Sequence, residues 1–355
     1  MSTSFTHGRV LFHAARATLR VPAATPPGMV PGRLSILSPG TEQRRMDATQ
    51  NGPDRDAGYM NIATIPAPAA RATAAGSGIG QAGDEGADGV HVVAPVPHGA
   101  AFTPSIPGAL TAGPGTDVNV LAVARFQLIA ARGLDRVPAA LNTALSTRRA
   151  VAVPDGRGLT TVADTLGEVV VVGSGPVALG CVLELRRRGA DQIRVITSRL
   201  AAPISAAPGV ICVDPASARR APFVVDAAGA PGRACTLATQ TGVVGLLGTP
   251  AAVQALDAAA VHRSGTVVVG MHELAGARPD AADTRDGAGR PLGASWCASY
   301  QDTYTAVVNW LISDVDPAVL RSWCQRIPGE QAPEIYARLR RGDRPPAPIV
   351  LWDWS

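Results

Sequence analysis

Lysine is absent from this chain of 355 residues, and all 32 of its basic residues are arginines. Chemistry that depends on a lysine side chain is therefore excluded. This removes Schiff-base catalysis, lysine-anchored pyridoxal phosphate and the phosphate-binding lysine of a Walker loop. The tyrosine–lysine pair used by one class of dehydrogenases is excluded for the same reason. These absences narrow the reaction class and leave the substrate open.

Aromatic residues are scarce as well, at 4% of the chain, and the arginines are scattered, with one run of three at Arg186, Arg187 and Arg188. A nucleic-acid-binding surface combines a basic stripe with stacking aromatics, so we expect no nucleic-acid partner. Long apolar runs are also missing, because the stretch from Val169 to Leu183 is interrupted by glycines and a proline. It is too short to span a bilayer, and we expect no membrane partner.

The five cysteines form no close pair, which indicates reduced thiols. The first twenty residues lack the charged segment and apolar core of a secretory signal peptide. Both observations predict a cytoplasmic protein. No cysteine precedes Cys181, and His7, His13, His91 and His98 do not have the spacing of metal ligands, so we expect no metal site.

The chain contains two regions that differ in how their apolar runs, turn residues and helix-forming segments are spaced. The first 115 or so residues hold short β-type runs between prolines and glycines, with Ala72 to Gly89 predicted as a loop. A helix is predicted from Val118 to Leu134. Six β-branched runs then alternate with helix-forming segments, which predicts an α/β fold with a six-stranded parallel sheet covered on both faces. These runs are 169–172, 193–197, 210–213, 223–226, 243–247 and 266–270. The tail returns to helix from Gln301 and ends in a strand, 348–352.

The strongest motif follows the first of these strands. It reads strand, then Gly173-x-Gly175-x-x-Ala178, then helix, which is the context of a dinucleotide-binding loop. The first glycine permits a tight turn, the second lets the backbone approach a pyrophosphate, and the small third residue lets the helix pack on the strand. The helix N-terminus attracts the phosphates. The residues in between complete the predicted cofactor loop: Ser174, Pro176 and Val177.

The end of the second strand indicates which dinucleotide binds. An NAD site has an acidic residue there, whereas this chain has Thr197, Ser198 and Arg199. Hydroxyls and a guanidinium suit a 2′-phosphate, so NADP(H) is predicted as the cofactor, with NAD(H) as the alternative. The other interpretation of Arg199 is an exposed side chain without a ligand. Pro203 and Pro208 follow, which predicts a short or irregular crossover in place of a full helix.

The whole chain resembles the medium-chain dehydrogenase/reductase superfamily. The resemblance rests on the order of PGMVPGRLSILSPGTE, GYMNIATI, HVVAPVPHGA, GSGPVALG, VVDAAG, VVGLLGT and SGTVVVG, with AVVNWL and IVLWDW near the end. It implies a GroES-like β-rich catalytic domain over 1–140, a Rossmann domain over 141–295 and a return segment over 296–355 that completes the catalytic domain. It also implies a substrate cleft at the domain junction, Gly248 among the cofactor-binding residues, and a homodimer joined through the edges of the sixth strand.

The departures from this family concern zinc. Where zinc members have a cysteine and a histidine ligand, this chain has the stretch Ser38 to Glu42 and the stretch Gly58 to Asn61. The four-cysteine structural lobe is missing as well. The resemblance therefore implies a zinc-independent branch, in which hydrogen-bond donors stabilise the reacting oxygen.

Four polar residues replace the zinc shell and are the candidate catalytic residues: Thr41, Glu42, Tyr59 and His98. The Tyr59 hydroxyl could reach the reacting oxygen, or its ring could fill the vacated space. His98 could act as an acid or base, or be an ordinary loop histidine. Glu42 could be structural, bonding backbone within its turn.

Other polar residues carry weaker expectations. Asp226 ends the fourth strand, where a turn or packing role is expected. His272 and Glu273 follow the sixth strand and could line the pocket, whereas Trp296, Cys297 and Tyr300 could do so or pack at an interface.

The sequence favours an NADP(H)-dependent oxidoreductase that transfers hydride between nicotinamide and a secondary alcohol or ketone of a small polar substrate. Such a substrate would be a sugar, a cyclitol or a biosynthetic intermediate. The first alternative is a zinc-free reductase of activated C=C bonds. The second is a dinucleotide-binding protein that catalyses no net redox reaction or serves as a sensor or partner subunit.

Overall fold

A computed structural model describes residues 9–20, 25–66, 89–137, 169–199, 201–250, 255–273 and 292–354. The predicted loop from Ala72 to Gly89 lies almost entirely outside this part of the chain. Two compact units make up the chain. Unit 1 comprises Met1–Ala122, Cys324–Pro345 and Ile349–Ser355, and unit 2 comprises Val123–Trp323 and Pro346–Pro348. By this division, the limits predicted at 140/141 and 295/296 both fall inside unit 2. Within the described ranges, no helix combines the length and apolarity that crossing a membrane requires.

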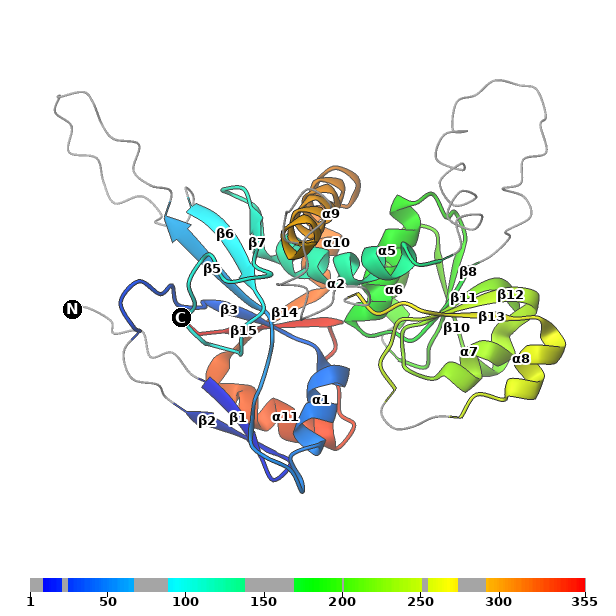
Figure 1. The fold of residues 1–355 in the computed structure, drawn as a ribbon, viewed down its shortest axis with the longest axis horizontal. Helices are drawn as coiled ribbons and strands as arrows, with labels where there is room; N and C mark the ends of the chain where they lie inside the picture. The colour runs from blue at the N-terminus through cyan, green and yellow to red at the C-terminus, as the bar shows by residue number, and fades with distance from the viewer. Residues whose placement is uncertain are drawn as a thin grey trace. The chain divides into compact units, whose positions relative to one another are not determined.

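Unit 2, whose sheet is drawn in green to yellow in Figure 1, is built on a six-stranded parallel sheet with the order β10-β9-β8-β11-β12-β13. The strands are β8 (Val169–Val172), β9 (Ile193–Ile196), β10 (Val210–Val213), β11 (Ala221–Asp226), β12 (Ala238–Leu246) and β13 (Val267–Gly270). All six predicted strands are present, so the predicted parallel α/β domain is confirmed. Strand β12 begins five residues earlier than predicted, because Ala238 already pairs with Ala221 ahead of a register shift.

The helices and turns of unit 2 are α2 (Val118–Leu134), which begins in unit 1, α5 (Pro176–Arg187), α6 (Ala201–Ser205), η1 (Pro215–Ser217), α7 (Pro231–Leu237), α8 (Ala258–Ser264), α9 (Leu292–Asp314) and α10 (Pro317–Ser322). Helix α6 has only five residues, as expected from Pro203 within it. Helix α7 covers one face of the sheet, where Ala234 and Leu237 pack on Val172 and Val224.

Close packing of α2 against α5 depends on one glycine. A Cβ on Gly180 of α5 would lie 2.3 Å from the carbonyl oxygen of Phe126 in α2. Because such a contact is far inside van der Waals distance, only a glycine lets the two helices approach this closely. The approach fixes α5, and with it the glycine loop at its N-terminus, against the rest of unit 2.

Unit 1 contains a mixed six-stranded sheet of order β14-β15-β3-β5-β6-β7 and a three-stranded antiparallel sheet of order β2-β1-β4. Their strands are β1 (Arg9–His13), β2 (Arg16–Arg20), β3 (Leu34–Leu37), β4 (Arg55–Asp56), β5 (Asn61–Pro66), β6 (Gly89–Ala94), β7 (Leu110–Ala112), β14 (Cys324–Pro328) and β15 (Ile349–Asp353). The unit also contains α1 (Pro39–Asp47), η3 (Gly329–Gln331) and α11 (Ala332–Arg340). Strand β15 pairs with β3, so the C-terminal segment completes the N-terminal sheet.

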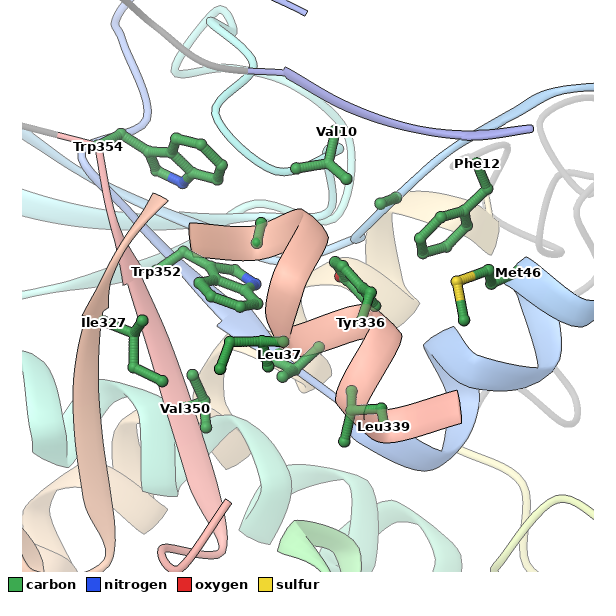
Figure 2. Packing of buried hydrophobic residues seen from close by; sticks show 13 residues of the cluster. Val10, Phe12, Leu37, Met46, Ile327, Tyr336, Leu339, Val350, Trp352 and Trp354 are labelled. Atoms are coloured by element: carbon green, nitrogen blue, oxygen red, sulfur yellow. The ribbon is translucent and has the colours of Figure 1, made fainter. Parts of the chain in front are cut away.

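A buried apolar cluster joins the two sheets of unit 1 to α1 and α11 (Figure 2). It includes Phe12 of β1, Met46 of α1, Tyr336 of α11 and Trp352 of β15. The ring of Tyr336 lies between the other two aromatic rings, 5.0 Å from Phe12 and 5.9 Å from Trp352 by ring centroids. The phenol oxygen of Tyr336 is therefore buried and requires a polar partner inside the core.

Candidate functional site

The glycine loop after β8 is shaped to accept a phosphate group. Gly173 has a φ of 116°, a conformation that favours glycine, and a Cβ on it would lie 3.2 Å from the Cβ of Ala228. Gly175 is the N-cap of α5, where no side chain caps the helix, and a Cβ on it would meet no atom within 4 Å. The backbone there is open on its outer side. The first-turn N–H groups can therefore bind an anion directly.

Asp226, at the end of β11, organises the neighbouring turn. Its carboxylate is fully buried and accepts the N–H of Ala228 at 3.0 Å, and burial raises the pKa of this carboxyl. Gly248, after β12, approaches the same turn so closely that a Cβ on it would lie 2.5 Å from the nitrogen of Gly229. Asp226 thus has a turn-forming role, as its sequence position predicts. These turns lie at the carboxyl ends of the central strands, where ligands bind in open parallel sheets.

The end of β9 presents hydroxyls and a guanidinium. Thr197 is half-buried and its Oγ1 accepts the N–H of Arg199 at 3.0 Å, so it shapes the turn. Ser198 and Arg199 are exposed beside it. No acidic residue stands among these three positions. The arrangement leaves two donors able to meet an anion.

Glu42 and His98, two predicted catalytic residues, meet in the core of unit 1. Both side chains are fully buried, and His98 Nε2 lies 2.8 Å from Glu42 Oε2. The same carboxylate oxygen accepts the hydroxyl of Tyr336, whose pKa is raised well above its ordinary value, first by burial and then by the Glu42 charge. Glu42 Oε1 accepts the N–H of Ser38 at 3.1 Å. The backbone bond expected for Glu42 within its turn is therefore present.

This buried network is closely packed on the histidine side. A Cβ on Gly58 would lie 2.4 Å from the ring of His98, and Gly58 has a φ of 81°. The ring of Trp352 meets that of His98 edge-on at 6.3 Å. Sequence reasoning missed Tyr336. Its place beside Ile335 and Leu339 on a helix with a strong apolar side is the pattern that predicts burial, and a buried tyrosine hydroxyl requires a partner.

Thr41 and Tyr59, the other two predicted catalytic residues, are half-buried near a guanidinium that sequence reasoning also missed. Arg44 Nη2 donates to Thr41 Oγ1 at 3.4 Å. Burial lowers the pKa of Arg44, and the charge of the Tyr59 phenolate form acts to raise it, which places Tyr59 near the guanidinium. The structure therefore separates the four candidates into a core pair and a half-exposed pair.

In unit 2, Glu273 ties the segment after β13 to two helices. Arg125 of α2 donates two hydrogen bonds to its carboxylate, at 2.8 and 3.0 Å, and the hydroxyl of Tyr300 from α9 donates a third at 2.6 Å. Burial opposes ionisation of Glu273, but the Arg125 charge and these hydrogen bonds outweigh it and lower the pKa. His272 beside it is exposed. The side chains of Trp296 and Cys297 lie outside the described part.

Across the ranges that the structure describes, no three His, Cys, Asp or Glu side chains gather as a metal-binding group. No protein-family profile and no curated protein sequence matches the chain.

Solved structures do match it over nearly its full length. The alcohol dehydrogenase TADH from Thermus sp. ATN1 matches with a TM-score of 0.59 at 16% identity, covering 98% of this chain and 99% of that chain. The alcohol dehydrogenase of Thermotoga maritima gives 0.59 at 11% identity, covering 98% of both chains. The yhdH oxidoreductase from Salmonella enterica, solved in complex with NADP, gives 0.56 at 13% identity, covering 98% of this chain and 99% of that chain.

The chain has the medium-chain dehydrogenase fold. The predicted fold class is confirmed, since both the β-rich unit and the six-stranded parallel unit are present in the predicted order. At these identities the likeness concerns the fold alone.

Proposed function

We propose that the chain is an NADP(H)-dependent oxidoreductase that interconverts a ketone and a secondary alcohol on a small polar substrate without zinc. The observation that carries the proposal is the open glycine loop at the carboxyl end of β8. Gly175 leaves room for a pyrophosphate against uncapped backbone N–H groups, on a fold shared with solved dehydrogenases.

The preference for NADP(H) rests on Ser198 and Arg199. In dinucleotide-binding folds an acidic residue at this strand end bonds the ribose 2′-hydroxyl, and its charge repels a 2′-phosphate. Here the exposed hydroxyl and guanidinium can bind that phosphate instead. The cofactor, when bound, supplies the hydride that reduces the carbonyl carbon.

The remaining task for the protein is to hold the reacting oxygen and give it a proton. Glu42 and His98 are occupied by one another and by Tyr336 in the core, whereas Thr41 and Tyr59 are half-exposed. We therefore assign Tyr59 as the proton donor and Thr41 as a hydrogen-bonding partner of the substrate. Glu42 and His98 act as positioning residues, because they fix the turn from which Thr41 projects.

The test is a titration of the purified chain with NADPH and NADH, followed by nicotinamide fluorescence, with metal analysis of the same sample. We expect NADPH to bind more tightly than NADH. Arg199→Gln should weaken NADPH binding by about 10- to 100-fold, which is the affinity that one or two charge-assisted hydrogen bonds contribute. It should leave NADH binding nearly unchanged. Arg263→Gln removes an exposed arginine of α8 with the same charge change and serves as the matched control.

Two results would overturn parts of this proposal. Failure to bind either dinucleotide would remove the oxidoreductase function, and stoichiometric zinc would remove the zinc-independent chemistry. Tight NADPH binding without turnover of any ketone or enone would favour the sensor or non-redox alternative.

We also propose that the protein is a cytoplasmic homodimer paired through β13. This strand lies at the edge of the parallel sheet, and Val267 on it is 46% exposed, which suits pairing with a second copy. Light scattering should give twice the chain mass of 36.3 kDa, and a monomer mass would contradict the dimer. Fractionation of cells should recover the protein with the cytoplasmic proteins, and recovery elsewhere would contradict that compartment.

A further inference from the structure

Arg44 is placed differently from its neighbour Arg45. Its guanidinium turns back over the start of α1, where Nη2 bonds Thr41 Oγ1 and Nη1 lies 3.9 Å from the position of a Cβ on Gly40. The adjacent Arg45 is instead occupied by the carbonyl oxygens of Gly58 and Asp56, at 3.2 and 3.1 Å. Arg44 therefore holds its charge beside hydroxyl groups at a half-buried position.

In the part of the chain that the structure describes, no acidic side chain pairs with Arg44. Its one hydrogen bond there is the bond to Thr41. By contrast, Arg9 pairs with Asp56 at 2.5 Å and Arg338 with Asp343 at 2.7 Å. Partial burial strips water from a guanidinium and lowers its pKa, which costs free energy unless an anion compensates. Binding of an external anion at Arg44 would therefore offset this cost.

Thr41 provides a second donor for such an anion. Its Oγ1 accepts from both Ser38 Oγ, at 3.3 Å, and Arg44 Nη2. With its lone pairs used in this way, the hydroxyl hydrogen of Thr41 remains to be donated outward. Tyr59 adds a phenol hydroxyl near the same guanidinium.

We propose that Arg44 and Thr41 form a carboxylate-binding subsite beside Tyr59, so that the substrate is a keto acid or the corresponding hydroxy acid. A carboxylate fits better than a phosphate ester, because one uncompensated positive charge balances one negative charge, and the planar guanidinium matches a carboxylate with two parallel bonds. This inference deepens the proposed function and rests on it for the reaction, although anion binding at Arg44 can be measured without any turnover.

Reduction of the ketone needs one hydride, which NADPH would supply, and one proton, which Tyr59 supplies. NADPH, when bound, would supply the hydride that forms the C–H bond at the ketone carbon and would leave as NADP⁺. The electron pair of the C=O bond moves to the oxygen, and one proton from the Tyr59 hydroxyl completes the alcohol. The phenolate then regains a proton from solvent. The carboxylate and Arg44 keep their charges throughout and only orient the ketone.

Calorimetric titration with unreactive monoamides and their neutral diamides tests the subsite directly. The probes are oxamate, malonamate and succinamate against oxamide, malonamide and succinamide, titrated into the NADPH-bound chain. We expect at least one monoamide to bind about 10- to 100-fold more tightly than its diamide. Arg44→Gln should abolish that difference and leave the NADPH dissociation constant unchanged. Arg16→Gln, an exposed arginine of β2 with the same charge change, should preserve it.

The same variants give a kinetic readout. For the wild-type chain, keto acids such as pyruvate, acetoacetate and 4-oxopentanoate should have higher kcat/KM than their methyl esters. Arg44→Gln should remove that preference mainly through KM. Equal binding of acid and neutral probes would overturn the carboxylate subsite, even with an active ketone reductase. Loss of NADPH affinity in Arg44→Gln would also overturn it, since Arg44 would then serve the cofactor.

Two further outcomes separate the inference from the proposed function. Tighter binding of inorganic phosphate than of any monoamide, lost in Arg44→Gln, would overturn the assignment to a carboxylate. Monoamide binding that depends on Arg44 in a chain that binds no dinucleotide would support the subsite while the proposed redox function fails.

Discussion

Replacing Glu42 by alanine is expected to lower the free energy of unfolding of unit 1 by about 3–5 kcal/mol. The carboxylate is fully buried and accepts from the Ser38 N–H, the His98 ring and the Tyr336 hydroxyl. Its removal takes the acceptor from three buried donors. His98 Nε2 and the Tyr336 hydroxyl, 3.1 Å apart, can still pair with each other, and each donor left unpaired costs about 1–3 kcal/mol. Loss of a buried charge and entry of water offset part of that cost. Urea unfolding followed by hydrogen exchange in β15 and α11 measures the loss in this unit alone.

Two further variants show whether the loss of stability in Glu42→Ala comes from the hydrogen-bond network or from the lost volume of the side chain. Tyr336→Phe removes one hydroxyl from the cluster of Figure 2 and should cost about 1.5 kcal/mol. Glu42→Gln keeps the size of the side chain but loses acceptor capacity, and should fall between the other two variants. A cost below 0.5 kcal/mol for Glu42→Ala would mean that the three donors find other acceptors, which would contradict a structural role for this carboxylate.

The fold was predictable from the sequence because its signals are local. Helix α2 spans the predicted residues Val118 to Leu134, and β8 spans Val169–Val172 as predicted, since both are long or strongly apolar patterns with clear boundaries. The early start of β12 was not predictable. Before Val243 it contains Thr239, Gln240 and Thr241, which are polar and at least partly exposed, and this segment becomes a strand only by pairing with β11.

The candidate site was less predictable because its contacts join distant parts of the chain. Tyr336 lies 238 residues from His98, and no spacing rule connects them. Arg44 and Arg45 are neighbours of the same type, so only the structure shows that Arg45 bonds carbonyl oxygens whereas Arg44 is turned toward Thr41. The glycine loop was predictable, because its residues are consecutive and its role lies in the backbone.

The second large effect concerns activity. Tyr59→Phe should reduce kcat for ketone reduction by about 10²- to 10⁴-fold, the usual contribution of a positioned proton donor, with the NADPH dissociation constant unchanged. The oxygen that receives the electron pair would then have to take its proton from water. Tyr59 is half-buried near Arg44 rather than in the core, so the change should leave the fold intact, and circular dichroism with thermal unfolding serves as the control.

The same variant distinguishes reduction of C=O from reduction of C=C. In an enone that carries no carboxylate, the proton is added at carbon, and the enolate oxygen needs only hydrogen-bond donors. Thr41 and Arg44, which then hold no substrate carboxylate, are such donors in the variant. Loss of one donor among several should then cost about tenfold or less. A drop of at least 10² with ketones and a small drop with enones would identify Tyr59 as the donor to a ketone oxygen. An unchanged rate with ketones would remove Tyr59 from the mechanism, and solvent or another group would have to supply that proton.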